Sequence, residues 1–285
     1  MRLTRELARR FEDHFAEHFE TLMRCSLSIG SNPENYAFYR DGTLRATCST
    51  NPHASWTRCA YHVNQQPAES VRRVVDFFHQ YSMPAKLRII PDGFTPQQAD
   101  VLTALGLRHI GFHTILWAPL PILNADERTD ESGEPTIVAA DLAEIEIREA
   151  TTQTDIDAHI DIQLAAYGVP RPEIESLRPL RRLWWNLPHL RFYLACVDGV
   201  PAAQAILDCR DDVAYLASGS TMPGFRKRGL HTALILRRLR DAEAAGCRVV
   251  FGATDFENVS RLNQMACGLQ VAYTAAWWVE PMGKL

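Results

Sequence analysis

The sequence lacks any long apolar run, since none approaches the roughly 18 apolar residues that a membrane-spanning helix needs. It also lacks paired cysteines: the seven are scattered without CxxC spacing, which argues against a disulfide framework and a structural zinc site. The formal net charge is only -4, so we do not expect a general nucleic-acid binder. The first residues lead into a polar helix pattern and not into a signal peptide. Together these absences predict a soluble, cytoplasmic protein with reduced thiols and no metal.

The length and composition favour two domains. The chain has 285 residues, of which 46% are hydrophobic, and this is enough for a substantial core, with a single domain as the alternative. Residues 124–143 are polar and acidic and contain Gly133 and Pro135, so they predict a linker between residues 1–123 and 144–285.

The C-terminal half alternates between the periodicity of strands and that of helices. Asp198 and Gly199 indicate a hairpin turn. The expected strands are 143–150, 190–197, 201–209, 213–221, 247–254 and one or two within 272–279, and the expected helices are 154–167, 172–185, 230–245 and 259–267.

The N-terminal half carries a fainter copy of this order. Residues 36–42 resemble 192–199, and they are followed by helix, strand, helix and strand patterns over 71–81, 86–91, 97–105 and 107–118. A strand–helix order that occurs twice predicts a duplication.

The segment from Thr221 to His231 follows a strand pattern and opens a helix pattern. Such a loop places backbone N–H groups and the positive end of a helix dipole around an anion. Arg226, Lys227 and Arg228 add positive charge, and Gly229 lets the main chain turn and approach a ligand. The alternative is a solvated basic turn. Binding of nucleic acid is not expected, because no aromatic residue interleaves the charges.

This loop resembles the V-x-P-x-x-R/Q-G-x-G-x-G/A motif of the GNAT superfamily of acyl-CoA-dependent N-acyltransferases. The first, third, R/Q and middle glycine places are taken by Thr221, Pro223, Arg226 and Gly229. Lys227 and His231 depart from the motif, where glycine and Gly or Ala are usual. Residues 260–269 resemble the fourth helix of the family and its corner at Gly268. The loop at 63–70, in the first copy, has neither the arginine nor the glycine.

The resemblance implies an α/β protein with two tandem GNAT-like domains, each a mixed, mostly antiparallel sheet flanked by helices. The second domain would be catalytic and would move an acetyl group from acetyl-CoA to a primary amine by direct attack in a ternary complex. The first would serve as scaffold, part of the acceptor pocket or dimer contact. The residues implied to bind the coenzyme are Gly219, Ser220, Thr221, Arg226, Lys227, Arg228, Gly229, Leu230, His231, Thr232, Ser260 and Asn263, the last two with helix capping as the alternative.

The acid and base are less defined. The tyrosine that protonates the leaving thiolate in the family falls on Gln264, which cannot act as an acid. Tyr273 and Tyr215 are the substitutes, with half-buried strand aromatics as the alternative. Asp255 and Glu257 are candidate bases or solvated carboxylates. A protein acid is also dispensable if the thiolate leaves unaided.

The acceptor is expected to be a small-molecule or peptide amine, and the protein a monomer or homodimer without nucleic-acid or membrane partners. Two other classes stay open at this point. One is a non-catalytic CoA-binding sensor or regulatory protein, and the other is an interaction module whose basic loop binds an acidic protein or RNA.

Overall fold

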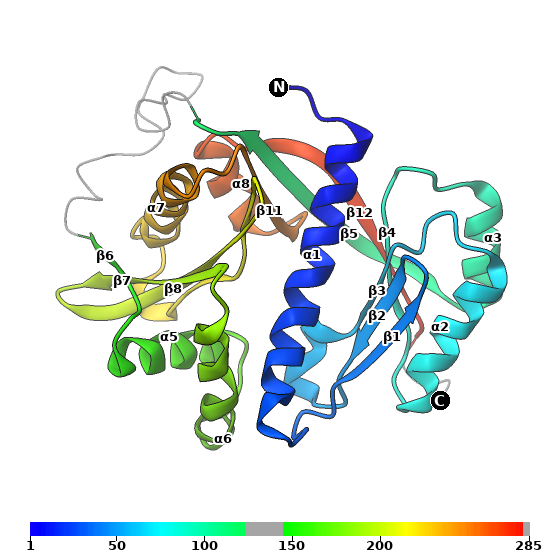
Figure 1. The fold of residues 1–285 in the computed structure, drawn as a ribbon, viewed down its shortest axis with the longest axis horizontal. Coiled ribbons are helices and arrows are strands. Elements are labelled where there is room, and N and C mark those ends of the chain that lie inside the picture. Colours follow the sequence, from blue (N-terminus) through cyan, green and yellow to red (C-terminus); the bar gives the residue numbers. More distant parts are fainter. Residues whose placement is uncertain (123–144, 282–285) are drawn as a thin grey trace. The chain divides into compact units, whose positions relative to one another are not determined.

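The computed structural model describes residues 1–122 and 145–281, so the predicted linker at 124–143 lies outside the described residues (Figure 1). The chain forms two compact units. The C-terminal unit is built mainly from residues 116–271, and the N-terminal unit from residues 2–115 together with the chain from 272 onward. The boundaries of these units differ from those of the predicted domains, 1–123 and 144–285. The C-terminal unit includes the strand residues from Leu116 onward, and the N-terminal unit includes the strand residues from Ala272 onward.

The C-terminal unit contains the strands β6 (Ile145–Glu149), β7 (Leu190–Val197), β8 (Val200–Arg210), β9 (Val213–Leu216), β10 (Gly219–Thr221) and β11 (Val249–Asp255). Its helices are α5 (Gln153–Ala166), α6 (Arg171–Arg182), α7 (Leu230–Ala244) and α8 (Val259–Ala266), with the 3-10 turns η3 (Leu183–Asn186) and η4 (Pro223–Phe225).

The sheet of this unit is mixed and mostly antiparallel, as predicted. β6, β7, β8 and β9 pair in antiparallel order, and β9 pairs with β11 in parallel. The hairpin turn between β7 and β8 falls at Asp198 and Gly199, both with positive φ, as predicted. α5 and α6 lie on one face of β6 to β8 and α7 lies on the other (Figure 1).

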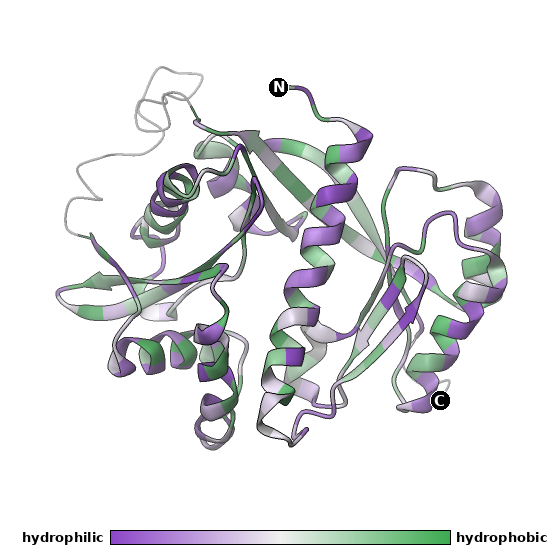
Figure 2. Ribbon diagram, in the orientation of Figure 1, coloured by the Kyte–Doolittle hydropathy of each residue, from purple (hydrophilic) through white to green (hydrophobic). Residues whose placement is uncertain are grey.

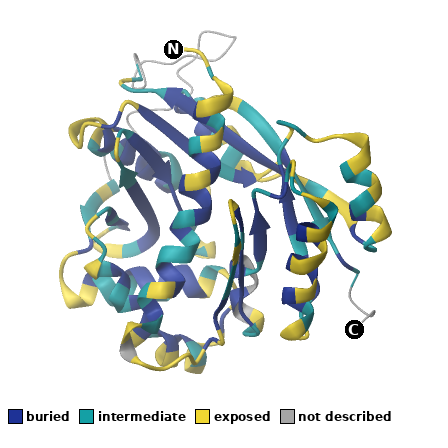
Figure 3. Ribbon diagram, turned by 45° about the vertical axis from the view of Figure 1, so that its right-hand side comes forward, coloured by how far each residue is buried: buried dark blue, intermediate teal, exposed yellow. Residues whose placement is uncertain are grey.

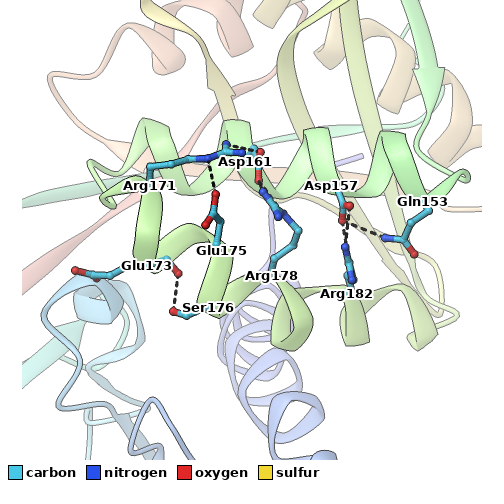
Figure 4. Close-up of polar contacts among 9 residues, drawn as sticks. All are labelled: Gln153, Asp157, Asp161, Arg171, Glu173, Glu175, Ser176, Arg178 and Arg182. Carbon is cyan, nitrogen blue, oxygen red and sulfur yellow. Dashed lines mark hydrogen bonds and ion pairs between the residues drawn. The ribbon is translucent and has the colours of Figure 1, made fainter.

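Ion pairs join α5 to α6 in the C-terminal unit (Figure 4). Arg178 contacts Asp161 at 2.7 Å, and Arg182 contacts Asp157 at 2.8 Å. Beneath them, Ile160, Leu164 and other residues of the two helices form a buried apolar cluster. The cluster supplies most of the stabilisation, because partly exposed ion pairs contribute at most about 1 kcal/mol each. These contacts fix the helix that faces β8 and β10.

The N-terminal unit contains α1 (Arg5–Ser26), η1 (Leu27–Ile29), β1 (Ala37–Asp41), β2 (Leu44–Cys48), η2 (Pro52–Thr57), β3 (Cys59–Tyr61), α2 (Ala68–Gln80), β4 (Lys86–Ile89), α3 (Pro96–Ala104), the greater part of β5 (Arg108–Pro119) and most of β12 (Gln270–Val279). Strands β1, β2 and β3 pair in antiparallel order, β3 pairs with β4 in parallel, and β4 pairs with β12. The predicted strand–helix–strand–helix–strand order of this half is confirmed.

The helices of the N-terminal unit are amphipathic. α1 alternates polar and apolar residues along its ribbon (Figure 2), and α2 alternates buried and exposed residues (Figure 3). Val71, Val74, Val75 and Phe78 form the buried face of α2 and pack with residues of β2 and β4. A stripe of this spacing buries one side of a helix against a sheet.

None of the seven cysteines forms a disulfide bond. In the part of the chain that the structure describes, none of the helices is long and apolar enough to cross a bilayer. The same residues hold no cluster of three or more histidine, cysteine or acidic side chains suited to a metal ion.

Candidate functional site

The strand predicted over 213–221 is broken in two by a bulge at Ala217 and Ser218. Ser218 has a φ of 36°, and the Ile206 N–H group points at the carbonyl oxygens of both bulge residues, at 3.1 and 3.2 Å. Before the bulge, β9 pairs with β11 as far as Leu216 and Gly252. After it, β10 pairs with β8 and with none of the other described strands. The strand before the loop therefore separates from β11 and presents one edge that no other described strand covers.

Arg238 of α7 forms a hydrogen bond with this bulge. Its side chain is fully buried and donates from Nη1 to the carbonyl oxygens of Ile206 (2.9 Å) and Ala217 (3.0 Å). Nε donates to Leu234 one turn back on the same helix (3.0 Å). Burial lowers the pKa of Arg238 to about 10, so the group is still charged at neutral pH. A buried cation thus donates hydrogen bonds to the main chain at the point where the strand bends.

A cluster of polar side chains lies where β8, the bulge before β10 and α5 meet. Gln204 is fully buried and donates from Nε2 to Ser218 Oγ (3.1 Å) and Ser220 Oγ (2.9 Å). Gln163 of α5 also donates to Ser218 Oγ (3.2 Å). Gln204 Oε1 has no partner among the described residues. The sequence analysis missed this cluster, although a glutamine inside the apolar run of β8 was an available signal.

The loop between β10 and α7 has the predicted strand–loop–helix order. Lys227 (φ 63°) and Gly229 (φ 77°) are both left-handed, and Gly229 stands directly before the first helical residue, Leu230. The first N–H groups of any helix have no acceptor within the helix. Gly229 has no side chain to cap them, so the amides of Leu230, His231 and Thr232 are available to a ligand.

The three basic residues of the loop are exposed. Arg226 Nε lies 3.4 Å from the carbonyl oxygen of Thr221, and the Arg228 guanidinium lies 5.9 Å from the centre of the Phe225 ring. Their charges add to the positive end of the α7 dipole. The Leu230 side chain is buried in the core and leaves only its amide to the loop. This arrangement suits a phosphorylated ligand.

The His231 side chain turns inward. Its Nδ1 lies 2.9 Å from the side-chain nitrogen of Asn263 on α8, and a β-carbon built on Gly219 would lie 3.2 Å from its Nε2. Burial and the charge of Arg238 lower the pKa of His231 to about 4, so the imidazole is neutral at neutral pH. Asn263, predicted either to bind the coenzyme or to cap the helix, contacts this histidine, and its role toward the coenzyme stays a prediction.

α8 has no acidic side chain at Gln264, the position that corresponds to the tyrosine of the family. Asn258 caps α8 by accepting from the Ser260 N–H group (2.9 Å), so Ser260 is not the cap. Gln264 is buried and donates to Ser260 Oγ (3.2 Å). Its Oε1 lies directly over Gly252 on β11 and has no partner among the described residues. A carboxamide thus fills the space beside this strand.

Tyr273 belongs to the N-terminal unit, whereas the loop residues belong to the C-terminal unit. Its hydroxyl donates to Glu12 Oε1 at 2.7 Å, and Glu12 also accepts two hydrogen bonds from Arg88, both at 2.8 Å. Burial and the Glu12 charge raise the pKa of Tyr273 well above its usual range. Its catalytic role stays a prediction.

The other predicted catalytic residues lie in the C-terminal unit. Tyr215 is buried and stacks on Phe251, with ring centres 4.6 Å apart. Asp255 ends β11 and Glu257 follows it, and both are exposed. Their roles also stay predictions.

The matching loop of the N-terminal unit is filled by its own side chains. Asn64 accepts from the Ile90 N–H group (3.1 Å) and donates to the carbonyl oxygens of Ile90 (2.7 Å) and Asp92 (3.1 Å). The end of the Gln65 side chain lies where a β-carbon on Gly93 would be. β3 and β4 pair at one position only, Ala60 with Leu87, and the backbone beyond it is satisfied by the Asn64 carboxamide.

Comparisons with known proteins agree with this geometry. The model of the acetyltransferase (GNAT) family matches residues 156–268, which span α5 to the corner after α8. A GCN5-related N-acetyltransferase from Kribbella flavida has a similar fold, with a TM-score of 0.61 and 16% identity over 95% of this chain and 96% of that chain. A search of curated proteins finds no match.

Two further solved structures are similar in fold. One is a tandem GNAT protein from the clavulanic acid biosynthesis pathway, with a TM-score of 0.59 and 15% identity over 94% of both chains. The other is a GCN5-related N-acetyltransferase from Sphaerobacter thermophilus, with a TM-score of 0.55 and 15% identity over 78% of this chain and 71% of that one. Residues 156–268 thus match the model of the acetyltransferase (GNAT) family, and the chain has a fold similar to that of a tandem GNAT protein.

Proposed function

We propose that this protein transfers an acetyl group from acetyl-CoA to a primary amine by direct attack within a ternary complex. The observation that carries the proposal is the left-handed Gly229, which opens α7 beside the unpaired edge of β10. The amine nitrogen attacks the thioester carbonyl, a C–N bond forms and the C–S bond breaks. The amine loses one proton, CoA leaves as a thiolate and takes up one proton, and the products are an acetamide and free CoA.

In this proposal the main chain does most of the binding. The pyrophosphate of the coenzyme accepts hydrogen bonds from amides between Lys227 and Thr232, while Arg226 and Arg228 supply charge. The pantetheine arm lies along Gly219, Ser220 and Thr221 as an added strand would, and a β10 amide polarises the thioester carbonyl.

In this proposal solvent-exposed groups or water take the proton from the amine, and protonation of the thiolate is a separate step. The acceptor amine must be neutral to attack, and the exposed carboxylates of Asp255 and Glu257 are the candidates to take its proton, directly or through water. Gln264 has no proton to give, so the thiolate leaves unprotonated or takes its proton from water or from Tyr215. We assign the coenzyme to the C-terminal unit alone, because Asn64 and Gln65 occupy the matching loop of the N-terminal unit.

Calorimetric titration with CoA tests this assignment. We expect one site per chain, lost in Gly229→Asp, which brings a carboxylate to the phosphate cradle, and in the Arg226→Glu/Arg228→Glu pair. Gly246→Asp is the matched control, because Gly246 is also left-handed (φ 86°) and exposed but ends α7 at the opposite pole. Two sites per chain, no binding, or equal loss in the control would contradict the proposal.

A non-catalytic CoA-binding sensor is the second candidate, and the carboxamide of Gln264 at the place of the family tyrosine favours it. Release of free thiol from acetyl-CoA in the presence of a panel of small amines and peptides separates the two. Release above the hydrolysis background with any acceptor supports the enzyme, whereas binding without release supports the sensor.

A further inference from the structure

His231 stands in the loop motif where Gly or Ala is usual, yet its side chain is neither exposed nor packed only against apolar groups. The imidazole lies between two elements of the C-terminal unit. Asn263 of α8 is on its Nδ1 side, and Gly219 of β10 is on its Nε2 side. The second neighbour matters most, because Gly219 belongs to the strand edge that has no strand partner among the described residues.

The two ring nitrogens of His231 are not equivalent. Nδ1 faces the Asn263 side-chain nitrogen at 2.9 Å, so Nδ1 acts as the acceptor and the proton of the neutral ring is on Nε2. Nε2 has no hydrogen-bond partner in the described parts of the chain. The Nε2–H donor therefore lies against the exposed backbone of Gly219 and has no acceptor among the described residues.

The absence of a side chain at position 219 keeps this donor accessible from the strand. A methyl group on Gly219 would approach Nε2 to 3.2 Å and cover it. Glycine at 219 and histidine at 231 are thus complementary, since the first leaves open the space into which the second directs its N–H group. A purely structural histidine has no need of that space.

We propose that His231 is a coenzyme-binding residue that donates from Nε2 to a carbonyl oxygen of the acyl-CoA arm where the arm passes Gly219. This inference rests on the proposed function. The acceptor is either an amide carbonyl of pantetheine or the thioester carbonyl, and both are neutral oxygens of the same kind. Asn263 is then the positioning residue, because its contact with Nδ1 keeps the donor on Nε2 and fixes the ring.

The test compares the affinities for CoA and for acetyl-CoA by calorimetry at neutral pH. We expect His231→Ala to weaken acetyl-CoA binding about 3- to 10-fold, the effect of one neutral hydrogen bond. His231→Gln, whose side-chain nitrogen reaches the place of Nε2, should stay within about twofold of the unmodified protein, inside the range of one weak hydrogen bond. Equal loss for CoA points to an amide carbonyl, and loss for acetyl-CoA alone points to the thioester.

His159→Ala is the matched control for a merely structural role. His159 is a buried histidine of the C-terminal unit, and its Nε2 contacts the carbonyl oxygen of Ala205 at 3.3 Å. Its loss should lower stability without changing coenzyme affinity. Nitrogen-15 NMR of the imidazole gives an independent readout, because the coenzyme should shift Nε2 of His231 and leave Nδ1 in place.

Two results would overturn the inference while leaving the proposed function intact. One is unchanged or tighter binding of both coenzymes by a folded His231→Ala, which would make the ring a packing group or an obstacle. The other is a His231 spectrum that does not respond to a coenzyme that binds. Failure of the unmodified protein to bind either coenzyme would instead remove the proposed function itself, and this inference with it.

Discussion

The guanidinium group of Arg238 donates a hydrogen bond to the carbonyl oxygen of Ala217, with 3.0 Å between Nη1 and O. This contact joins the middle of α7 to the bulge that separates β9 from β10. A bulge that turns one strand away from its neighbour creates the open edge on which the proposed coenzyme site depends. The same helix begins directly after Gly229, so α7 supports both the loop at residues 221–231 and the strand edge.

Replacing Arg238 with methionine should weaken both features. The change removes the side-chain donor to the carbonyl oxygens of Ala217, Ile206 and Leu234, while it also removes the cost of burying a charge. We expect the free energy of unfolding in urea to fall by about 2–4 kcal/mol. CoA affinity should fall as well, because the bulge loses its support.

Arg248→Met is the control for the Arg238 variant. Arg248 is exposed at the start of β11, and its replacement should change the unfolding free energy by no more than about 0.5 kcal/mol. A stable Arg238→Met protein with unchanged CoA affinity would show that the bulge forms without the buried cation.

The strand–loop–helix order around Gly229 could be predicted from the sequence, whereas the bulge beside it could not. A strand pattern, a glycine among basic residues and a helix pattern are all local signals, and the structure has them in that order. The segment 213–221 contains no proline, and its apolar pattern continues across Ala217, so it was predicted as one strand. The break comes from hydrogen bonds to Arg238 and Ile206, which are distant in sequence.

The C-terminal strand shows the same limit. Residues 272–279 have the pattern of a strand, as predicted, but a pattern does not state its partner. In the structure Ala276 to Val279 pair with Ile89 to Lys86 of the N-terminal unit. The partner is chosen by long-range packing, where Trp278 and Ala276 meet the core around Leu87. Domain boundaries drawn from the linker alone cannot include such an exchange.

Asn64 offers a test of the idea that the N-terminal unit fills its own strand gap. Asn64→Ala removes three hydrogen bonds to the main chain of Ile90 and Asp92. We expect thermal and urea unfolding to show a loss of about 1–3 kcal/mol, because partly buried backbone groups lose their hydrogen-bond partners. The stoichiometry of CoA binding should remain one per chain.

Gln97→Ala is the control for the Asn64 variant, because Gln97 is exposed on α3 and its loss should be nearly neutral. The appearance of a second CoA site in Asn64→Ala would mean that the asparagine alone had kept the coenzyme out. An unchanged unfolding free energy would mean that solvent satisfies these backbone groups.

Two histidines with lowered pKa values, His159 and His231, make the C-terminal unit sensitive to acid. Burial lowers the pKa of His159 to about 3 and that of His231 to about 4, from an ordinary value of about 6.5. The unfolded chain therefore binds more protons than the folded chain below about pH 6.5. Stability is complete above that pH and falls as the pH drops, by up to about 1.4 kcal/mol per pH unit for each histidine.

The measurement is the free energy of unfolding in urea as a function of pH between about 4 and 7, the window in which both shifts act. His159→Leu should show a shallower slope than the unmodified protein, whatever its absolute stability. His109→Leu, at an exposed histidine of β5, should keep the full slope. Equal slopes in all three proteins would show that other groups dominate the acid response.

Tyr273 provides the last test, because its structural and catalytic interpretations predict different measurements. The hydroxyl donates to Glu12, which is buried and paired with Arg88, and a hydrogen bond to a charged group contributes about 1.5–3 kcal/mol. We expect Tyr273→Phe to lose about that much unfolding free energy and to keep its rate of thiol release from acetyl-CoA within about threefold, far less than the loss of a general acid causes. The raised pKa of Tyr273 supports this expectation, because a more weakly acidic phenol is a poorer donor to a thiolate.

Tyr81→Phe is the control, since Tyr81 is exposed in the same unit and should change neither quantity. A fall in the rate of about 100-fold or more in Tyr273→Phe, with stability preserved, would restore the tyrosine as the acid of the reaction. The phenol donates its proton to Glu12, with 2.7 Å between the two oxygens, so such a result would further require this hydrogen bond to break in the complex with acetyl-CoA. Glu12→Gln would then change the rate as well.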